Sequence, residues 1–327
     1  MKQSFDAYVA AAAFLKNGQA AFALGDGTVR FETGETIEAH QGAVLSACLH
    51  PSGEGLITGG DDGRLVASTP QGAKVLANLK GKWIDSVDAS AESGLVAFAA
   101  GREAGVRDLA DANFERRFAH ERTVAAVALD PKGRRLACAT YGGATLWFAR
   151  IAEQKPQMLK WAGSHIGVTF SPDGRFLLSA MQENALHGWR LSDGKEMRMG
   201  GYPSKVRSLV FLAKGGLMAT AGANGAVVWP FAGANGPMGK DATEIGFEET
   251  ESLVLRVAAA PTHGRLLAGL DDGRVWRADL AGRGLHFLKA EKGPAITALA
   301  LSPDGRRAAW GDEEGGAAVV DAGEMPA

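Results

Sequence analysis

The sequence predicts an all-β fold, a propeller of four-stranded antiparallel blades, and two observations support that prediction. The first is a phrase that returns eight times: an apolar strand, a tight turn that closes on glycine, and a second short apolar strand. The second is the spacing of these turns, which lie 35 to 49 residues apart. A period near forty with several short strands per repeat is typical of a β-propeller with one blade per repeat. The turn glycines are Gly18, Gly53, Gly94, Gly133, Gly174, Gly215, Gly264 and Gly305.

The fifth repeat illustrates how one phrase builds one blade. Its first turn reads Ser-Pro-Asp-Gly and ends at Gly174, so that proline presets φ and glycine takes the fourth turn position. A second turn surrounds Asn184, and a third contains the Asp-Gly pair that ends at Gly194. The four strands of this repeat are expected at 168–170, 176–178, 185–189 and 195–199.

Length and composition favour one domain over the whole chain. The chain has 327 residues, more than most single domains, but the repeat period runs through it without a linker, so 1–327 is predicted to be a single domain. The net charge is −2 with both signs interspersed, which disfavours a nucleic-acid partner. No stretch approaches the length of a membrane-spanning helix, so no membrane partner is expected either.

The two cysteines and the N-terminus point to a cytoplasmic protein. Cys48 and Cys138 lie in predicted strands of the second and fourth repeats, which are not neighbours in a propeller, so a disulfide between them is geometrically implausible. Buried thiols fit a reducing compartment. The apolar run at 7–15 could suggest an export signal, but it lies in register with the first strand of every later repeat, which explains it fully.

Closure of the ring is expected to use both ends of the chain. After the last third strand, at 317–320, too few residues remain for a fourth, outer strand. Residues 2–6 can supply it, which would close the ring with the N-terminal strand. The eight turns favour eight blades, and seven blades with one displaced unit is the alternative.

The repeats resemble the WD-repeat propeller family. The match consists of Ser-Pro-Asp-Gly, a leucine-rich strand, an Asp-Gly turn and a third strand that ends in tryptophan, and the string ENALHGWRLSDG at 183–194 follows it closely. Trp147, Trp189 and Trp229 occupy the family's repeat-tryptophan position, although no Trp-Asp dipeptide occurs in the chain. The resemblance covers essentially the whole chain. It implies a rigid, non-catalytic scaffold that holds its loops in fixed positions for binding.

The resemblance also implies a structural role for two histidines. In this family a loop histidine, a second-strand Ser or Thr, a turn aspartate and the tryptophan form a hydrogen-bond network. The second repeat offers His40, Thr58 and Asp62, but Ser68 occupies the tryptophan position. The fourth repeat offers His120 without a turn aspartate. We therefore expect His40 and His120 to be structural residues and not ligands.

Motifs for catalysis or metal binding are weak. The nearest approach to a phosphate loop, at 236–240, lacks the first glycine and the Ser or Thr that would bind magnesium. At the starts of the inner strands only Asp85 supplies a carboxylate, and one acid cannot coordinate calcium. We expect no metal, no cofactor and no enzymatic activity. The alternative is a propeller enzyme, of the hydrolase or lactonase type, that acts on a small molecule at the channel mouth.

The sequence therefore predicts a monomeric interaction scaffold that binds a protein or peptide partner at the mouth of the central channel. In WD-repeat propellers the loops that enter the inner strands line this mouth. Aromatic residues and arginine dominate interface hot spots, because they bury a large area at low entropic cost. The predicted partner-binding residues are Tyr8, Trp83, Asp85, Trp161, Tyr202, Lys205 and Arg207.

Overall fold

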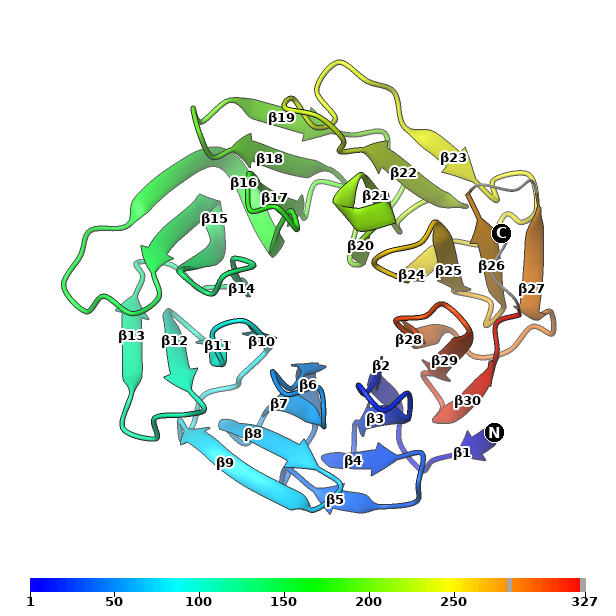
Figure 1. The fold of residues 1–327 in the computed structure, drawn as a ribbon, viewed down its shortest axis with the longest axis horizontal. Coiled ribbons are helices and arrows are strands. Elements are labelled where there is room, and N and C mark those ends of the chain that lie inside the picture. The colour runs from blue at the N-terminus through cyan, green and yellow to red at the C-terminus, as the bar shows by residue number, and fades with distance from the viewer. Residues whose placement is uncertain (281–283, 324–327) are drawn as a thin grey trace.

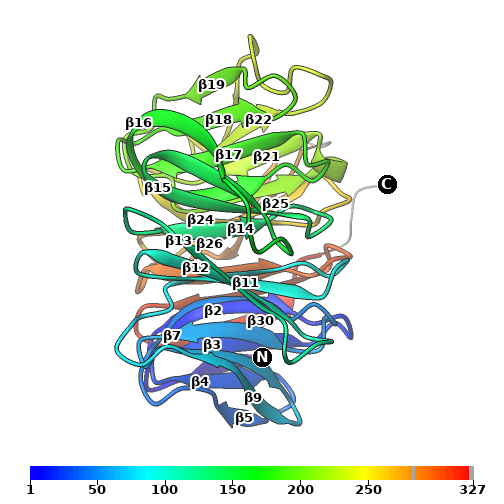
Figure 2. The ribbon, with the colours of Figure 1, turned by 90° about the vertical axis from the view of Figure 1, so that its left-hand side faces the viewer.

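The structure, a computed structural model, describes residues 1–280 and 284–323. Its strands surround a central axis, and the chain follows the ring from the blue N-terminal strands to the red C-terminal strands, which lie beside them (Figure 1). Seen from the side, the sheets are arranged like blades around a disc (Figure 2). The described strands form seven hydrogen-bonded sheets, six of four strands and one of six. The fold is thus an all-β propeller built from antiparallel blades.

The first three blades follow the predicted pattern, with each strand paired to the one before it and the first strand nearest the axis (Figure 1). The first consists of β2 (Val9–Phe14), β3 (Ala20–Leu24), β4 (Thr28–Phe31) and β5 (Thr36–Glu38). The second consists of β6 (Val44–Leu49), β7 (Leu56–Gly60), β8 (Arg64–Thr69) and β9 (Gly72–Asn78). The third consists of β10 (Ser86–Ala89), β11 (Leu95–Ala100), β12 (Glu103–Asp108) and β13 (Glu115–Ala119).

The six-stranded sheet, which we call the composite blade, contains the fourth and fifth repeats. Two of its strands, β15 and β16, are 14 residues long. The outer part of β16 pairs with β15, and its inner part pairs with β17. Its strands are β14 (Ala126–Leu129), β15 (Arg135–Phe148), β16 (Gln157–Phe170), β17 (Phe176–Met181), β18 (Leu186–Arg190) and β19 (Glu196–Met199).

The composite blade corrects the predicted blade number. The structure has seven blades, which was the alternative, and the preferred count of eight is wrong. All eight turn glycines still join the first two strands of a repeat, because the composite blade carries two of them. The physical reason lies at Gly142 and Gly143, which replace the usual Asp-Gly turn, and at Ser164, which pairs with Tyr141 and so keeps β16 continuous between the two repeats. The backbone of β15 folds back on itself here, since Ala149 N donates to Arg134 O at 2.8 Å.

The last three blades complete the ring. The sixth-repeat blade consists of β20 (Leu209–Leu212), β21 (Leu217–Thr220), β22 (Ala226–Pro230) and β23 (Thr243–Ile245), with a short 3-10 helix, η1 (Ala213–Gly215), in its first turn. The seventh-repeat blade consists of β24 (Val254–Ala259), β25 (Arg265–Leu270), β26 (Val275–Asp279) and β27 (Leu285–Lys289). The last consists of β28 (Ile296–Leu301), β29 (Arg307–Asp312), β30 (Gly316–Asp321) and β1 (Lys2–Ser4).

The outer strand of the last blade comes from the N-terminus. β1 pairs antiparallel with β30, with Lys2 opposite Ala318 and Ser4 opposite Gly316. The amino group of Met1 adds a hydrogen bond of 2.6 Å to Val319 O. The first and last segments of the chain are therefore joined in one sheet.

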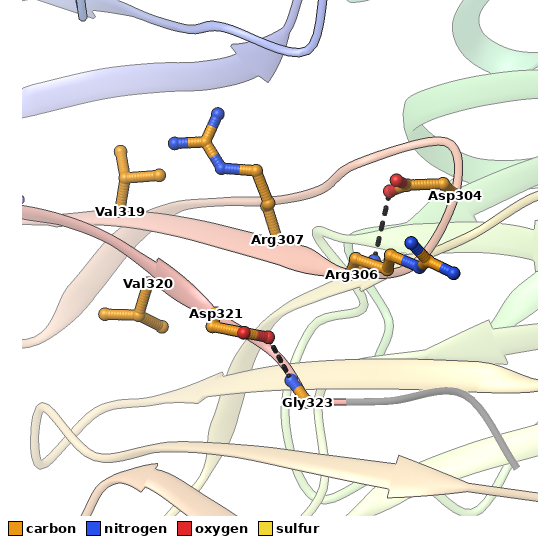
Figure 3. Close-up of a pocket in the computed structure, with 7 residues that line it drawn as sticks. All are labelled: Asp304, Arg306, Arg307, Val319, Val320, Asp321 and Gly323. Atoms are coloured by element: carbon orange, nitrogen blue, oxygen red, sulfur yellow. Dashed lines mark hydrogen bonds between the residues drawn. The ribbon is translucent and has the colours of Figure 1, made fainter.

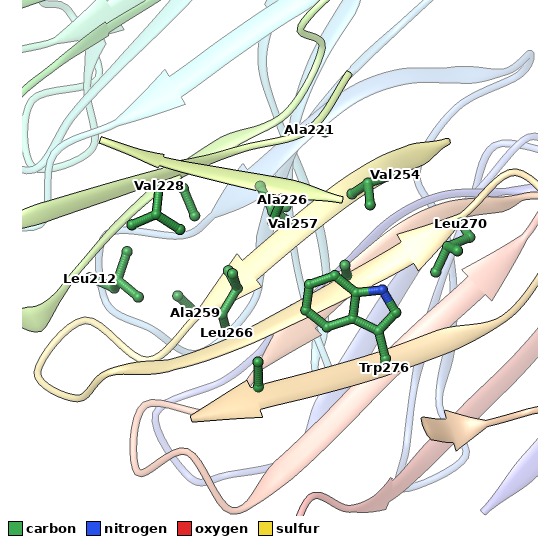
Figure 4. Packing of buried hydrophobic residues seen from close by; sticks show 13 residues of the cluster. Leu212, Ala221, Ala226, Val228, Val254, Val257, Ala259, Leu266, Leu270 and Trp276 are labelled. Atoms are coloured by element: carbon green, nitrogen blue, oxygen red, sulfur yellow. The ribbon is translucent and has the colours of Figure 1, made fainter. Parts of the chain in front are cut away.

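The hydrophobic core lies between neighbouring blades. Figure 4 shows one such interface, where the apolar side chains of β20 to β22 meet those of β24 to β26. Trp276 is fully buried there among aliphatic residues such as Leu266 and Val228. Each sheet thus buries both faces against its neighbours, and each interface removes apolar side chains from water. Within the described ranges no helix is long and apolar enough to span a bilayer.

Candidate functional site

The seven predicted partner-binding residues lie in segments that lead into the first strand of a repeat. Tyr8 precedes β2, Trp83 and Asp85 precede β10, and Trp161 lies where the outer part of β16 leads to its inner part. The remaining three precede β20. Because these segments all enter the inner strands, they lie at the same end of those strands and on one face of the disc. We call this the entry face.

Two of the predicted aromatic residues are exposed on the entry face. The side chain of Trp83 is 66% exposed, the largest exposure among the described large apolar residues, and that of Tyr8 is 40% exposed. Asp85, two residues beyond Trp83, is also exposed. Exposing a tryptophan gives up the stabilisation that its burial would provide, so Trp83 is available to a partner at no cost in core packing.

Trp161 is held in place by the composite blade. Its ring stacks on the imidazole of His187, with centroids 3.9 Å apart and planes 16° apart. Its backbone oxygen lies 3.1 Å from Nε2 of His165, whose Nδ1 lies 2.7 Å from Ser179 Oγ. Burial lowers the pKa of His187 to about 4, with smaller contributions from His165 and Arg198, so this imidazole is neutral at pH 7. Trp161 is therefore a fixed, partly buried ring at the edge of the face.

Tyr202, unlike Trp83 and Tyr8, is buried within the fold. It is only 7% exposed, and its hydroxyl lies 2.7 Å from Thr220 Oγ1. Trp229 Nε1 donates to the same hydroxyl at 2.7 Å. Tyr202 thus occupies the place of the loop histidine in the sixth repeat. The sequence prediction missed this because it looked for histidine at that position and treated an entry-loop aromatic as a contact residue.

The histidine networks of the second repeat and the fourth repeat have the expected structural character. His40 is buried, with Nε2 2.8 Å from Thr58 Oγ1 and Nδ1 3.0 Å from the Asp62 carboxylate. His120 Nε2 lies 2.9 Å from the hydroxyl of Thr145, and Trp147 Nε1 approaches the same nitrogen at 3.2 Å. These contacts occupy both histidines and leave neither ring free to bind a ligand.

Lys205 and Arg207 are brought together at a cavity of about 420 Å³ on the entry face. Arg256, at the start of the next inner strand, β24, lines the same cavity. The guanidinium of Arg256 donates to two backbone oxygens, Thr297 O at 2.7 Å and Leu255 O at 3.1 Å. Burial lowers the pKa of Arg256, and the neighbouring positive charge of Arg207 lowers it further. The cavity therefore gathers three cationic side chains.

Side chains of the inner strands also bridge neighbouring repeats around the channel. Ser86 Oγ accepts from Val127 N at 3.0 Å, and Ser208 Oγ accepts from Val257 N at 3.0 Å. The Asp88 carboxylate accepts from Leu129 N at 2.7 Å. Burial raises the pKa of Asp88 to about 6 against the opposing effect of this hydrogen bond. These contacts satisfy backbone donors at the unpaired edges of the inner strands.

A larger cavity, of about 810 Å³, lies away from the entry face, beside the first turn of the last repeat (Figure 3). Three of its four charged side chains, all but the exposed Arg306, have partners within the described part of the fold. Asp304 accepts from Arg306 N at 3.1 Å, and Asp321 accepts from Gly323 N at 2.6 Å, as the dashed lines in Figure 3 show. Arg307 pairs with Glu32 of the first blade. This cavity is therefore part of the ring's closure rather than a set of free polar groups.

Among the residues the structure describes, no group of three or more His, Cys, Asp or Glu side chains is placed to hold a metal ion. Asp85 and Asp88, just before and within the inner strand β10, belong to the third repeat, whereas the three cations belong to the sixth and seventh. These regions lie on different sides of the ring (Figure 1).

Arg256 is the member of the cationic cavity that the sequence prediction missed. A signal for it existed in the repeat spacing: Arg207 lies eight residues before the turn glycine Gly215, and Arg256 lies eight residues before Gly264. Aligning the repeats on their turns would have placed both guanidinium groups at equivalent positions of adjacent inner strands.

Comparisons with known proteins agree with this geometry. Residues 32–66 match the family model described as WD domain, G-beta repeat. A crystal structure of the computationally designed Ika8 protein is similar over 98% of both chains, with a TM-score of 0.78 and 18% identity, a likeness of fold alone. No curated protein matches the chain. The repeat match and the propeller arrangement together support a WD-repeat β-propeller.

Proposed function

We propose that this WD-repeat β-propeller is a non-catalytic scaffold that binds a protein or peptide partner on its entry face. WD-repeat propellers are commonly protein-interaction scaffolds. The observation that carries the proposal is the exposure of Trp83 on this face, beside the exposed Asp85 and on the same side of the disc as Tyr8 and Arg207. A tryptophan in this position can bury a large area against a partner without disturbing the core.

The rigidity of the scaffold supports the same function. Trp161 is stacked on His187. Ser204, beside Lys205, donates its backbone N–H to Gly222 O, and Gly222 N donates to Val254 O of the next repeat. Contact residues that are already held in place lose little conformational entropy when a partner binds. An entry face of this kind is suited to recognising an extended segment or a loop of another protein.

Partner capture in the native cell tests the proposal. The tagged chain is purified with its bound proteins, which are identified by mass spectrometry, in parallel with the variant Trp83→Ala/Arg207→Ala. We expect the variant to lose the specific partner, at a cost of roughly 2 kcal/mol or more for each hot-spot residue, while its circular dichroism spectrum remains native. Lys195→Ala/Arg198→Ala, at exposed positions on the outer rim, is the control. Undiminished capture by the first variant would place the binding surface elsewhere.

We also propose that the chain acts as a cytoplasmic monomer and does not bind nucleic acid. The balanced net charge of −2 and the two free thiols, Cys48 and Cys138, support this part of the proposal. Burial raises the pKa of the Cys138 thiol beyond the physiological range, which makes it an unreactive core group. Cell fractionation and light scattering of the purified chain test location and oligomeric state.

A further inference from the structure

The cavity formed by Lys205, Arg207 and Arg256 is distinguished by uncompensated positive charge. Several cations near the turns have acidic partners, such as Arg274 with Asp272. No ion pair joins Lys205, Arg207 or Arg256 to a carboxylate within residues 1–280 and 284–323. Arg207 and Arg256 carry like charges at one cavity, so the positive charge of each disfavours that of the other, and no carboxylate in the described ranges offsets it.

The burial of Arg256 strengthens this point. The side chain is partly buried, and two of its donors are fixed by Thr297 O and Leu255 O. This arrangement immobilises the guanidinium and leaves its Nη2 amino group without a protein acceptor among the described residues, near the positive charge of Arg207. A guanidinium that is already oriented loses little entropy when it forms charge-assisted hydrogen bonds with an oxyanion.

The backbone around the cavity is organised to hold the two inner strands together. Gly222 O accepts from Ser204 N at 3.1 Å, and Gly222 N donates to Val254 O at 3.0 Å. Gly222 has φ of +97°, and a Cβ there would lie only 3.1 Å from Lys205 O. Glycine thus permits a close approach that joins the Lys205 loop to the strand that carries Arg256.

Asn184 closes the cavity on the side of the composite blade. Its side chain donates to Pro203 O at 3.1 Å, in the loop before Lys205, and its φ of 52° is in the left-handed region. The cavity therefore has a fixed wall from the fifth, sixth and seventh repeats. Its volume of about 420 Å³ is within the range of small-ligand sites and large enough for one or two anionic side chains.

We infer that this cavity binds an oxyanion, a carboxylate or phosphoryl group, carried by an acidic segment of the protein partner. The inference rests on the proposed scaffold function and names the chemistry of the partner. Guanidinium groups bind both kinds of oxyanion in the same bidentate way, so the two sources share one recognition chemistry. A protein segment is favoured over nucleic acid, because three cations at one cavity do not form the extended basic surface that a phosphate backbone requires.

Peptide binding by the purified chain tests the inference. The probes are three fluorescein-labelled octapeptides that differ only in four positions, occupied by glutamate, by glutamine or by phosphoserine. Anisotropy is measured for the wild-type chain, for Lys205→Gln/Arg207→Gln, and for the charge-matched control Lys195→Gln/Arg198→Gln on the outer rim. The control also removes one lysine and one arginine charge, but from exposed positions that do not line the cavity.

We expect the glutamate or the phosphoserine peptide to bind wild type at least about tenfold more tightly than the glutamine peptide, and the cavity variant to lose that preference. The control should retain it. Preference for glutamate identifies a carboxylate source, and preference for phosphoserine alone identifies a phosphoryl source. Equal binding of all three peptides, or equal behaviour of the two variants, overturns the inference, as does tighter binding of a single-stranded oligonucleotide than of every peptide.

A partner-free measurement separates failure of this inference from failure of the scaffold function. Inorganic phosphate, at constant ionic strength, should raise the melting temperature of wild type and of the control but not of the cavity variant, because an anion that binds only the folded state stabilises it. If phosphate acts in this way and no protein is captured from cells, the anion site stands and the scaffold function fails. If a partner is captured but phosphate shifts all three proteins equally, the scaffold function stands and the anion site fails.

Discussion

The second and sixth repeats solve one structural problem with different side chains. In both, a residue of the entry loop reaches a threonine of the second strand, and the contact ties the loop to the sheet. In the second repeat the loop residue is His40, which bonds to Thr58 and to the carboxylate of Asp62. In the sixth it is Tyr202, which bonds to Thr220 and accepts from Trp229. The role belongs to the position in the repeat, and more than one hydrogen-bonding group can fill it.

The difference between the repeats lies in what completes each network. His40 uses a charged partner at a turn, and the tryptophan position is occupied by Ser68, whose hydroxyl is buried. Tyr202 uses no charged partner, but it is larger and packs into the same core cluster as Phe176 and Met218. The first network therefore depends more on electrostatics and the second more on packing.

Truncation of either loop residue to alanine should have the largest effect on the free energy of unfolding, and the loss should be greater for Tyr202 than for His40. Tyr202→Ala removes a buried aromatic ring from a packed cluster and should lower the free energy of unfolding by about 3 to 5 kcal/mol. His40→Ala leaves a smaller cavity, and its main cost is the loss of hydrogen bonds by buried groups, about 2 to 3 kcal/mol. Urea unfolding followed by tryptophan fluorescence measures both. A larger loss for His40→Ala would contradict the proposed division between packing and electrostatics.

Removal of the tyrosine hydroxyl alone should have a smaller effect. Tyr202→Phe keeps the ring in place but leaves Thr220 Oγ1 and Trp229 Nε1 without their shared partner, so we expect a loss of about 1 to 3 kcal/mol. The double variant Tyr202→Phe/Thr220→Val removes two polar partners together and serves as the control. The single variant Thr220→Val completes the comparison. If the double variant loses as much free energy of unfolding as the two single variants together, or more, the contact between the two hydroxyls does not contribute to stability.

These contrasts also show how far the sequence could predict the structure. The turn glycines and alternating strands predicted the antiparallel repeats, because turn chemistry and side-chain period are local properties. The joining of the fourth and fifth repeats into the composite blade depends on pairing between Tyr141 and Ser164, which no local pattern specifies. For this reason the preferred number of blades was wrong.

The candidate site was predictable to a similar extent. The sequence indicated that Lys205 and Arg207 lie in an entry loop, since loop position follows from the repeat. Their approach to Arg256 depends on the packing of adjacent blades, and the burial of Tyr202 depends on its contact with Thr220. Residue type alone cannot distinguish an aromatic side chain that is exposed for binding from one that is buried against other residues of the fold.

The pH dependence of the two networks should differ in direction. Burial alone would raise the pKa of Asp62, but hydrogen bonds from His40 and from the backbone N–H groups of Gln41 and Arg64 hold it below its usual value. A carboxyl group with a lowered folded-state pKa stabilises the protein above its unfolded-state pKa, and this contribution is lost as the pH falls through the folded-state value. The stability difference between wild type and Asp62→Asn should therefore be largest near pH 7 and shrink toward pH 3.

The sixth repeat should lose its contribution at the opposite end of the scale. Burial raises the pKa of Tyr202, against the opposing effect of its contacts with Thr220 and Trp229. A phenol with a raised folded-state pKa contributes fully below its unfolded-state value, and the contribution is lost as the pH rises through the folded-state value. The gap between wild type and Tyr202→Phe should shrink above about pH 10. Urea unfolding across the pH range measures both variants, and parallel curves would refute the contrast.

The smallest effect is expected at the tryptophan position of the second repeat. Ser68 is fully buried, and its hydroxyl has no hydrogen-bond partner among the described residues. Burial of an unpaired hydroxyl costs free energy that an alanine at the same position avoids, so Ser68→Ala should leave stability unchanged or raise it by up to about 1 kcal/mol. Ser179→Ala is the matched control, because Ser179 is an equally buried serine whose hydroxyl lies 2.7 Å from His165 Nδ1. That variant should lose about 1 to 2 kcal/mol. If Ser68→Ala destabilises the protein as much as Ser179→Ala does, then the hydroxyl of Ser68 contributes to the second repeat, and His40, Thr58 and Asp62 do not form a complete network without it.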